Sequence, residues 1–515
     1  MATLLSPDPE TATYPSPFRR MLITIPSMIA SIMVAVDITI ANVALPHMSA
    51  SLSAAQEQVL WVLTSYLVAG AIATPLSGWL AGRFGRKTVM VVSVAGFTVA
   101  SALCGMANDL PTIVFARFLQ GACGASLVPL SQAILLDINP PAEHAKAMAI
   151  FALGSMAGPI IGPTLGGYLT DALSWRWVFF VNVPFGIISF FGMIAFLPSS
   201  QTHRARFDLF GFATISIALA SLQLVLDRGE HLDWFDSGEI RVTALISLIA
   251  FWLALVHMFT AKNSFIRPEL FADRNFAIGA FFSIVIGIVA FATLPMIVVM
   301  TQTLLGYSAF QTGMIGLPRA IGSVVAMLLV TRLVALVDKR ALIIAGLAIT
   351  ALSMFMYAQM DLYVDETALL VAGFVQGFGG GLMFVPLSIV VFSTLAPTMR
   401  NEGAAMYSLT RNVGNAIGIS VLNYQVVHYV AASRAQLVEG VRADNPMLQW
   451  NRPDADFGSV ETMVRFNGEV ARQAAMVGDV RMYWLVFAIS LVVLPLVLLM
   501  RTGKNVDVST LHVGD

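Results

Sequence analysis

Asp37 and Arg117 are charged residues inside long apolar stretches of this sequence, and Asp37 is the only carboxylate well inside one of them. A guanidinium group in such surroundings costs from a few to more than about 10 kcal/mol unless it faces a partner or a water-filled cavity. Burial raises the pKa of a carboxyl group and a nearby cation lowers it, so a carboxyl group balanced between the two effects can bind and release a proton. We therefore expect Asp37 to be a proton-coupling acid, and Arg117 to lie beside it and favour its ionised form.

Two further arginines, Arg319 and Arg411, also fall within apolar stretches. Each either faces a cavity, where it would steer anionic substrates or the proton, or extends its side chain to the membrane interface. Other polar residues in these stretches either line a substrate cavity or hydrogen-bond between helices. The cavity candidates among them are Asn42, Gln120, Gln376, Asn412 and Asn415.

The distribution of histidine argues against catalysis. All seven histidines lie in loops, in tails or near the end of an apolar stretch. An enzyme within the membrane would need a nucleophile, a metal site or a His/Asp pair at that depth. We therefore expect no enzymatic activity, no metal ion and no cofactor.

The composition is that of a membrane protein. The 515 residues are 57% hydrophobic and 11% charged, whereas soluble proteins carry roughly 25% charged residues. The net charge of -1 shows no basic excess that would neutralise phosphates, so nucleic acid is not an expected partner. The two cysteines, Cys104 and Cys123, fall in apolar runs and are expected to pack as small hydrophobic residues.

The apolar stretches have the length of membrane-spanning helices. A bilayer core of about 30 Å requires about 20 residues of helix. Fourteen such segments are predicted, over residues 21–46, 59–81, 88–106, 110–136, 147–169, 177–197, 209–226, 242–260, 276–300, 310–331, 341–360, 368–392, 403–427 and 482–500.

The positions of Lys and Arg orient these segments. Seventeen of them lie on the side that holds the N-terminus, and only three lie in the short loops of the other side. Positively charged short loops stay in the cytoplasm during insertion. The sequence therefore predicts that both termini are cytoplasmic, and the first segment is too long for a cleaved signal peptide.

One stretch occurs twice. Gln120-Gly121 and Pro129 recur as Gln376-Gly377 and Pro386, at a shift of 256 to 257 residues. Such a repeat predicts two related helical bundles that bind substrate between them near the middle of the membrane. The expected division is a cytoplasmic tail over 1–20, a six-helix bundle over 21–200, two inserted helices and a linker over 201–275, a second six-helix bundle over 276–501 with a periplasmic helical loop at 428–481, and a cytoplasmic tail over 502–515.

Two sequence motifs are similar to those of a known family, one in the expected cytoplasmic loop between the second and third spans and one inside the fourth span. GWLAGRFGRK, from Gly78 to Lys87, is similar to the loop between spans two and three of the major facilitator superfamily, and Arg117-x-x-Gln120-Gly121 resembles its span-four motif. The resemblance implies a conformational-switch loop formed by Gly78, Arg83, Gly85, Arg86 and Lys87. Gly82 stands where the family usually has the Asp that latches the two halves, so another group must form the latch.

Two further motifs narrow the family. Gly158-x-x-x-Gly162-Pro163-x-x-Gly166-Gly167 resembles the antiporter motif of exporters, and VDITIANVALP, which contains Asp37, resembles the first span of drug:proton antiporters. SWRWVFFVNVP from Ser174, LDRGEHLDWF from Leu226 and LTRNVGNAIG from Leu409 are similar to 14-span antiporters of the EmrB type.

The resemblance implies an all-α membrane protein with the major facilitator fold and 14 transmembrane helices. It implies a proton-driven multidrug exporter of the bacterial inner membrane, acting on small amphipathic or hydrophobic substrates. A periplasmic adaptor and an outer-membrane channel are the implied partners. An importer, or an exporter of one fatty acid, siderophore or metabolite, remains the alternative.

The loop over 428–481 is predicted to form a helical hairpin that docks the adaptor. Helix-forming residues follow Ser433, and Asp444-Asn445-Pro446 is typical of a helix stop. Ser459 could cap the second helix, whose apolar residues recur at three- and four-residue spacing. This stripe comprises Val460, Met463, Val464, Val470, Ala471, Ala474 and Val477. The alternative is a hairpin that packs on itself without a partner.

Overall fold

The protein is a bundle of long helices. The computed structural model describes residues 14–54, 56–199, 207–261, 264–291, 293–396, 399–442, 444–451, 457 and 459–500. These residues form helices and contain no β-strand. Eleven of the helices in this part of the chain are long and apolar enough to cross a membrane, so the chain is a multi-pass membrane protein.

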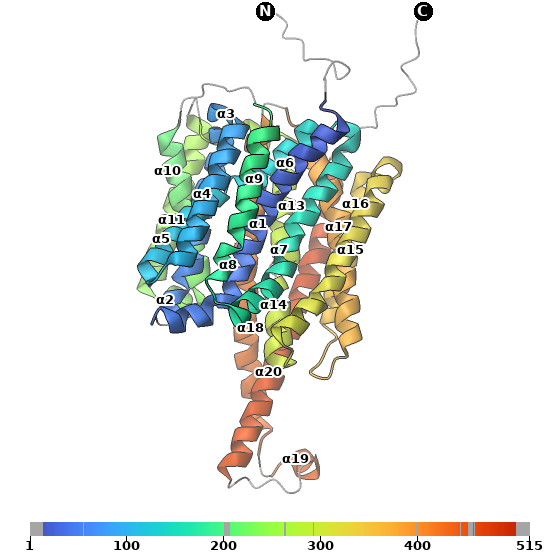
Figure 1. Ribbon diagram of the computed structural model, residues 1–515. Helices are drawn as coiled ribbons and strands as arrows, with labels where there is room; N and C mark the ends of the chain where they lie inside the picture. The colour runs from blue at the N-terminus through green and yellow to red at the C-terminus, as the bar shows by residue number, and fades with distance from the viewer. Residues whose placement is uncertain are drawn as a thin grey trace, which may run out of the picture.

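The N-terminal half of the bundle corresponds to the first six predicted spans (Figure 1). Two of these spans consist of two consecutive helices. The helices are α1 (Pro17–Ser51), α2 (Gln56–Val59), α3 (Trp61–Phe84), α4 (Arg86–Met106), α5 (Leu110–Gly124), α6 (Leu127–Ile138), α7 (His144–Ala172), α8 (Trp177–Phe180) and α9 (Asn182–Phe196).

The inserted pair consists of α10 (Leu209–Arg228) and α11 (Gly238–Thr260), which pack against each other. α10 also packs on α3 of the N-terminal half and on α18 of the C-terminal half. Asp208 ties the two ends of the pair together, because it caps α10 and lies 2.7 Å from His257 Nε2. Although burial opposes the effect, hydrogen bonds from the Gly211 and Phe265 amides and from His257 hold the pKa of Asp208 below its usual value.

The C-terminal half contains the remaining helices. Its first span is interrupted by two π-helical turns, which often occur at functional sites. The helices are α12 (Glu269–Ala272), α13 (Arg274–Ile286), η5 (Gly287–Phe291), α14 (Thr293–Val299), η6 (Met300–Leu304), α15 (Ala309–Leu336), α16 (Lys339–Tyr357), α17 (Glu366–Ser393), α18 (Arg400–Glu439), α19 (Pro446–Asn451), α20 (Val460–Val493) and η8 (Leu494–Leu499).

Eleven of the fourteen predicted spans coincide with helices that meet the length and hydropathy expected of a membrane span. The other three predicted spans fall on α7, on the interrupted segment from α13 to η6 and on α18, all of which are helical. The count of fourteen therefore stays a prediction, whereas the all-helical fold is confirmed.

Two helices extend far beyond the bundle. At 1.5 Å per residue, the 40 residues of α18 span about 60 Å and the 34 residues of α20 about 51 Å. A bilayer core takes up only about 30 Å of this length. Figure 1 shows that α18 and α20 project from the end of the bundle opposite to the start of α1. We call this end the hairpin end, and the end at which α1 begins, at Pro17, the tail end.

Candidate functional site

Asp37 lies in the middle of α1 and is fully buried. Three side chains donate hydrogen bonds to its carboxylate. Gln120 Nε2 and Asn182 Nδ2 donate to Oδ1 at 2.9 and 2.8 Å. Arg117 Nη1 donates to Oδ2 at 2.6 Å. Because an ionised carboxylate is an acceptor only, this arrangement fits the deprotonated form of Asp37.

Arg117 holds this cluster together from α5. Its Nε donates to the carbonyl oxygen of Val62 at 3.1 Å, and its Nη1 also donates to Gln120 Oε1 at 2.9 Å. The guanidinium carbon lies 4.2 Å from the ring centroid of Tyr66 and 5.5 Å from that of Phe179, both within the range of cation–π contacts. The buried cation therefore has an ion-pair partner, further hydrogen-bond acceptors and two aromatic rings around it.

The cluster draws on five helices of the N-terminal half. Ser101 Oγ on α4 accepts hydrogen bonds from Gln120 and Asn182, both at 3.1 Å. Removing one member of such a buried ion pair typically costs about 3 to 5 kcal/mol, because the other charge is left uncompensated. Protonation of Asp37 has the same consequence for Arg117. A proton bound at Asp37 would therefore favour a rearrangement of the helices that carry the cluster.

The glycine-rich motif of α7 packs directly on the helix that carries Asp37. A Cβ atom at Gly158 would overlap the backbone of Ala35, and one at Gly162 would overlap the side chain of Thr39. Gly166 meets Ile40 in the same way, with Ile40 O 3.0 Å from the position of a Cβ. Gly167 is buried, and Pro163 lies in the same helix, its side chain outside the described residues. These glycines allow the close approach of α1 and α7 that small residues permit in membrane helices.

A second polar cluster lies at the corresponding place in the C-terminal half. Gln376 Nε2 donates to Thr293 Oγ1 at 3.0 Å. Thr293 follows Asp37 by 256 residues, the same shift that relates Gln376 to Gln120. The hydrogen bond thus repeats the contact between Gln120 and Asp37, with a hydroxyl group in place of the carboxylate.

The predicted arginines belong to the C-terminal half and lie apart from the Asp37 hydrogen bonds. Arg319 on α15 interacts electrostatically with the buried Tyr357 on α16. A Cβ at Gly373 would lie 3.6 Å from Tyr357 Oη and 3.9 Å from Arg319 Cβ. Arg411 is 7% exposed, and its guanidinium carbon lies 6.0 Å from the ring centroid of Phe384.

The remaining cavity candidates do not share one environment. Asn42 on α1 and Asn412 on α18 are exposed, and Asn415 is partly buried next to the backbone of η5. In the part of the chain that the structure describes, no hydrogen bond joins these three asparagines to Asp37 or Arg117. The structure therefore brings together Asp37, Arg117 and Gln120, and leaves the substrate-binding roles of the others as predictions.

The tail end holds a group of charged residues that joins the two halves. Asp137 at the end of α6 pairs with Arg86 of the same half and with Arg400 of α18, whose Nη1 donates to Oδ1 at 2.8 Å. Arg86 Nε also reaches Asn401 Oδ1 at 2.5 Å. Burial and the charge of Arg400 lower the pKa of the neighbouring His144. Asp137 thus provides an acidic side chain that contacts the other half, whereas Gly82, at the position where the family usually has an acid, cannot.

The loop between α3 and α4 adopts the tight turn that its glycines predict. Gly85 has a φ of 85°, a conformation that favours glycine. The Cβ position of Gly78 lies 3.0 Å from Glu402 Cα, so this glycine allows α3 to touch α18. Lys87 Nζ donates to the carbonyl oxygen of Ile194 at 2.7 Å, and Arg83 is exposed. Gly82 has open space around its Cβ position.

The sequence reasoning missed four functional candidates. Asn182 lies within the motif SWRWVFFVNVP, which was assigned to the family without a role for this residue. Tyr66 and Ser101 carry no motif, and only the structure shows that they contact Arg117 and Gln120. Asp37 was predicted to be the only deep carboxylate, but Asp479 on α20 is also buried at 7% exposure. That residue was assigned to the outer loop because the apolar run begins only after Arg481.

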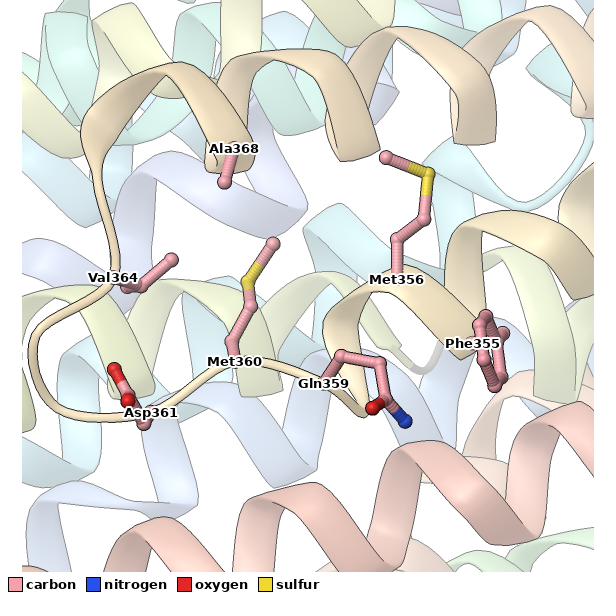
Figure 2. Close-up of a pocket in the computed structure, with 7 residues that line it drawn as sticks. All are labelled: Phe355, Met356, Gln359, Met360, Asp361, Val364 and Ala368. Carbon is pink, nitrogen blue, oxygen red and sulfur yellow. The ribbon is translucent and has the colours of Figure 1, made fainter.

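A surface cavity of about 370 Å³ lies between the hairpin-end segments of α16 and α17 (Figure 2). Its lining includes Met356, Gln359, Met360 and Asp361. None of its lining residues belongs to the Asp37 cluster. We assign it no part in the chemistry of the buried site.

Comparisons with known proteins identify the family of this chain. Residues 27–419 match the family described as the Major Facilitator Superfamily. The chain is 32% identical over 484 residues to the multidrug export protein EmrB of Escherichia coli K12, covering 93% of this chain and 94% of that protein. It is 30% identical over 486 residues to the fatty acid resistance protein FarB of Neisseria gonorrhoeae, covering 93% and 96%. The solved structure of the proton:xylose symporter XylE has the same fold, with a TM-score of 0.57 at 14% identity, covering 92% of this chain and 95% of that one.

Proposed function

This chain belongs to the major facilitator superfamily, and we propose that it is a proton-driven multidrug exporter, an antiporter that moves small amphipathic or hydrophobic molecules out of the cell. The names of the similar multidrug export proteins support export rather than import. These names also favour a multidrug exporter over an exporter of a single metabolite. The proton gradient would supply the energy, so that no cofactor takes part.

The buried ion pair of Asp37 and Arg117 is the observation that carries this proposal. A carboxyl group inside the membrane that is compensated by one cation has two stable conditions. It is either ionised and paired with the cation, or protonated and no longer paired with it. In the structure Asp37 accepts three hydrogen bonds, which favour the ionised condition. Proton uptake from the outside would weaken this cluster, and substrate binding from the inside would favour release of the proton.

The glycine motif of α7 links the proton site to the movement of the halves. α7 packs on α1 around Asp37, and it also packs on α15 and α17 of the other half. In the C-terminal part of α7, Thr164 lies so close to α15 that a Cβ at Gly313 would overlap it. A rearrangement of α1 upon protonation would thus be transmitted to an interface between the halves.

We further propose that the tail end faces the cytoplasm and that the membrane is the bacterial inner membrane. The bias of Lys and Arg toward this end supports the orientation. The same orientation assigns the charged group around Asp137 to a cytoplasmic latch. Breaking and remaking this latch would open and close the inner side during transport.

The projecting hairpin is proposed to dock a periplasmic adaptor that leads to an outer-membrane channel. The outer part of the apolar stripe on α20 is uncovered, since Val460, Met463 and Val464 are 79%, 43% and 64% exposed. The inner part is covered by the bundle, with Val470 and Ala474 at 8% and 0%. An apolar stripe that lies beyond the bilayer and stays uncovered is typical of a surface that meets another protein.

Transport by purified protein in liposomes tests the proposed function. We expect a fluorescent lipophilic cation to accumulate against its gradient when a pH gradient is imposed, and a protonophore to abolish the accumulation. Accumulation that persists at full rate with the protonophore present would exclude proton-driven export.

A further inference from the structure

Asp479 is a buried carboxyl group for which the mechanism above has no use. It lies in α20 at 7% exposure. Within the described part of the chain, no lysine, arginine or histidine forms an ion pair with it, and no hydrogen bond to it is formed. Its situation is the opposite of that of Asp37, which is compensated by Arg117.

The surroundings of Asp479 are apolar and rich in methionine. On α20 it lies between the buried residues Met476 and Met482. These two residues belong to the same core as Met300 and Met360. Apolar side chains of this kind do not stabilise a negative charge.

Few titratable groups approach this part of α20. Tyr483, one helical turn away on the same helix, is the group whose electrostatic interaction with Asp479 is resolved. Its ring stacks on Tyr357 of α16 with 5.1 Å between the centroids, and its hydroxyl donates to Met300 Sδ at 3.8 Å. On α18, which packs on the other side, Tyr429 lies under Arg481 and His428 stacks on Tyr424. η5, η6 and η8 contain no titratable residue.

The place of Asp479 relates to the internal repeat. Tyr357 follows Ser101 by 256 residues, the shift that relates Thr293 to Asp37. In the C-terminal half, Tyr483 stacks on Tyr357. In the N-terminal half, Asn182 hydrogen-bonds to Ser101, the residue that corresponds to Tyr357. Asp479 therefore stands one helical turn from the C-terminal counterpart of the Asp37 cluster, in a half whose cluster has Thr293 in place of an acid.

We propose that Asp479 is a second proton-binding carboxyl group of the exporter, located on the hairpin-end side of the C-terminal cluster. An unpaired buried carboxylate costs several kcal/mol, so the group holds a proton and is neutral in this state. It would take up the proton from water at the hairpin end, and it would ionise and release the proton toward the tail end when the helices rearrange and the tail end opens. The inference rests on the proposed proton-driven export for its role in transport, but the proton on Asp479 can be detected without transport.

Infrared difference spectroscopy of the purified protein detects this proton directly. A protonated carboxyl group in an apolar site gives a C=O stretching band separate from that of carboxylates. We expect a band at neutral pH that is lost in Asp479→Asn and retained in Asp37→Asn. Glu469→Gln on the same helix is the matched control, because Glu469 is exposed, and this variant should keep the band. Asparagine mimics the neutral acid in size and charge, so the Asp479→Asn protein is expected to fold. A spectrum of Asp479→Asn that retains the full band would overturn the proposal.

The stoichiometry of transport tests the role of the proton. In proteoliposomes, the pH gradient at which net substrate flux vanishes gives the number of protons exchanged per substrate. We expect this number to fall in Asp479→Asn and to stay unchanged in Glu469→Gln. An unchanged number in Asp479→Asn would show that Asp479 carries no transported proton. If the wild-type protein showed no dependence on the pH gradient, the proposed function would fail, and the infrared band would still decide whether Asp479 holds a proton.

Discussion

Thr293 occupies in the C-terminal half the position that Asp37 occupies in the N-terminal half. Each accepts a hydrogen bond from the glutamine of the repeated motif, Gln376 or Gln120. The repeat therefore preserves the backbone and the glutamine, while only the N-terminal copy keeps a carboxylate paired with an arginine. This asymmetry supports the proposal that Asp37 is a proton-coupling acid.

Arg117→Lys tests whether the planar guanidinium is required. Lysine keeps the charge but cannot bond Val62, Asp37 and Gln120 at once, as Arg117 does. Losing one or two buried hydrogen bonds of about 1 to 3 kcal/mol each should reduce the transport rate about tenfold or more. The variant should insert and elute as a single species in size-exclusion chromatography. A transport rate equal to that of the wild type would contradict the role of the cluster.

Arg117→Ala tests the charge itself. Without the cation, the Asp37 carboxylate loses the buried ion pair that compensates its charge. We therefore expect the pH profile of transport to change. Arg434→Ala is a control, since Arg434 is an exposed arginine that bonds Asn467 in the hairpin. The same pH profile in Arg117→Ala and wild type would count against coupling between the two residues.

Asp137→Asn should loosen the closed tail end. It removes both ion pairs of Asp137, including the one with Arg400 that joins the halves. These pairs are partly exposed and contribute about 0.2 to 1 kcal/mol each, so the equilibrium should shift without unfolding. Spin labels at the exposed Arg83 and Arg332 report the distance between halves, and we expect a larger population of long distances in the variant. Glu143→Gln breaks a pair with Arg20 inside one half and should leave the distances unchanged. Equal distributions in both variants would refute the latch.

Shortening the hairpin separates docking from transport. Ala474, Met476 and Asp479 are buried against the bundle, so the replacement should cover only residues 435–466. A Gly/Ser linker there should leave substrate binding intact and cut drug resistance of intact cells. Val464→Gln, on the uncovered part of the stripe, is the milder variant and should also weaken resistance. Full resistance with the shortened hairpin would exclude docking through it.

Much of the fold was predictable because membrane spans carry a strong signal. The apolar runs located the helices, and the repeat of Gln120-Gly121 placed two halves around a common layout. The pairing of Asp37 with Arg117 followed from the cost of leaving either charge alone in an apolar region. The second helix of the hairpin begins at Val460 with Ser459 in the N-cap position, as predicted, although the serine side chain makes no capping hydrogen bond.

The rest of the site depends on contacts that a linear pattern does not contain. Asn182 is the first residue of α9, and only the structure shows that its side chain reaches Asp37 on α1. Asp479 looked like a loop residue because Arg481 separates it from the apolar run that follows, whereas packing of α20 on α16 and α18 buries it. Asp137 could be placed at the end of a span, but its pairing with Arg400, 263 residues away, required the structure.

Proton-driven transport by Asp37→Asn tests the central claim most directly. Asparagine keeps the size of the side chain and accepts a hydrogen bond from Arg117, but it cannot bind and release a proton. In proteoliposomes, we expect the variant to exchange labelled for unlabelled substrate at equilibrium, and to show no accumulation when a pH gradient is imposed. Accumulation of substrate by Asp37→Asn under a pH gradient, at the level of the wild type, would contradict the account.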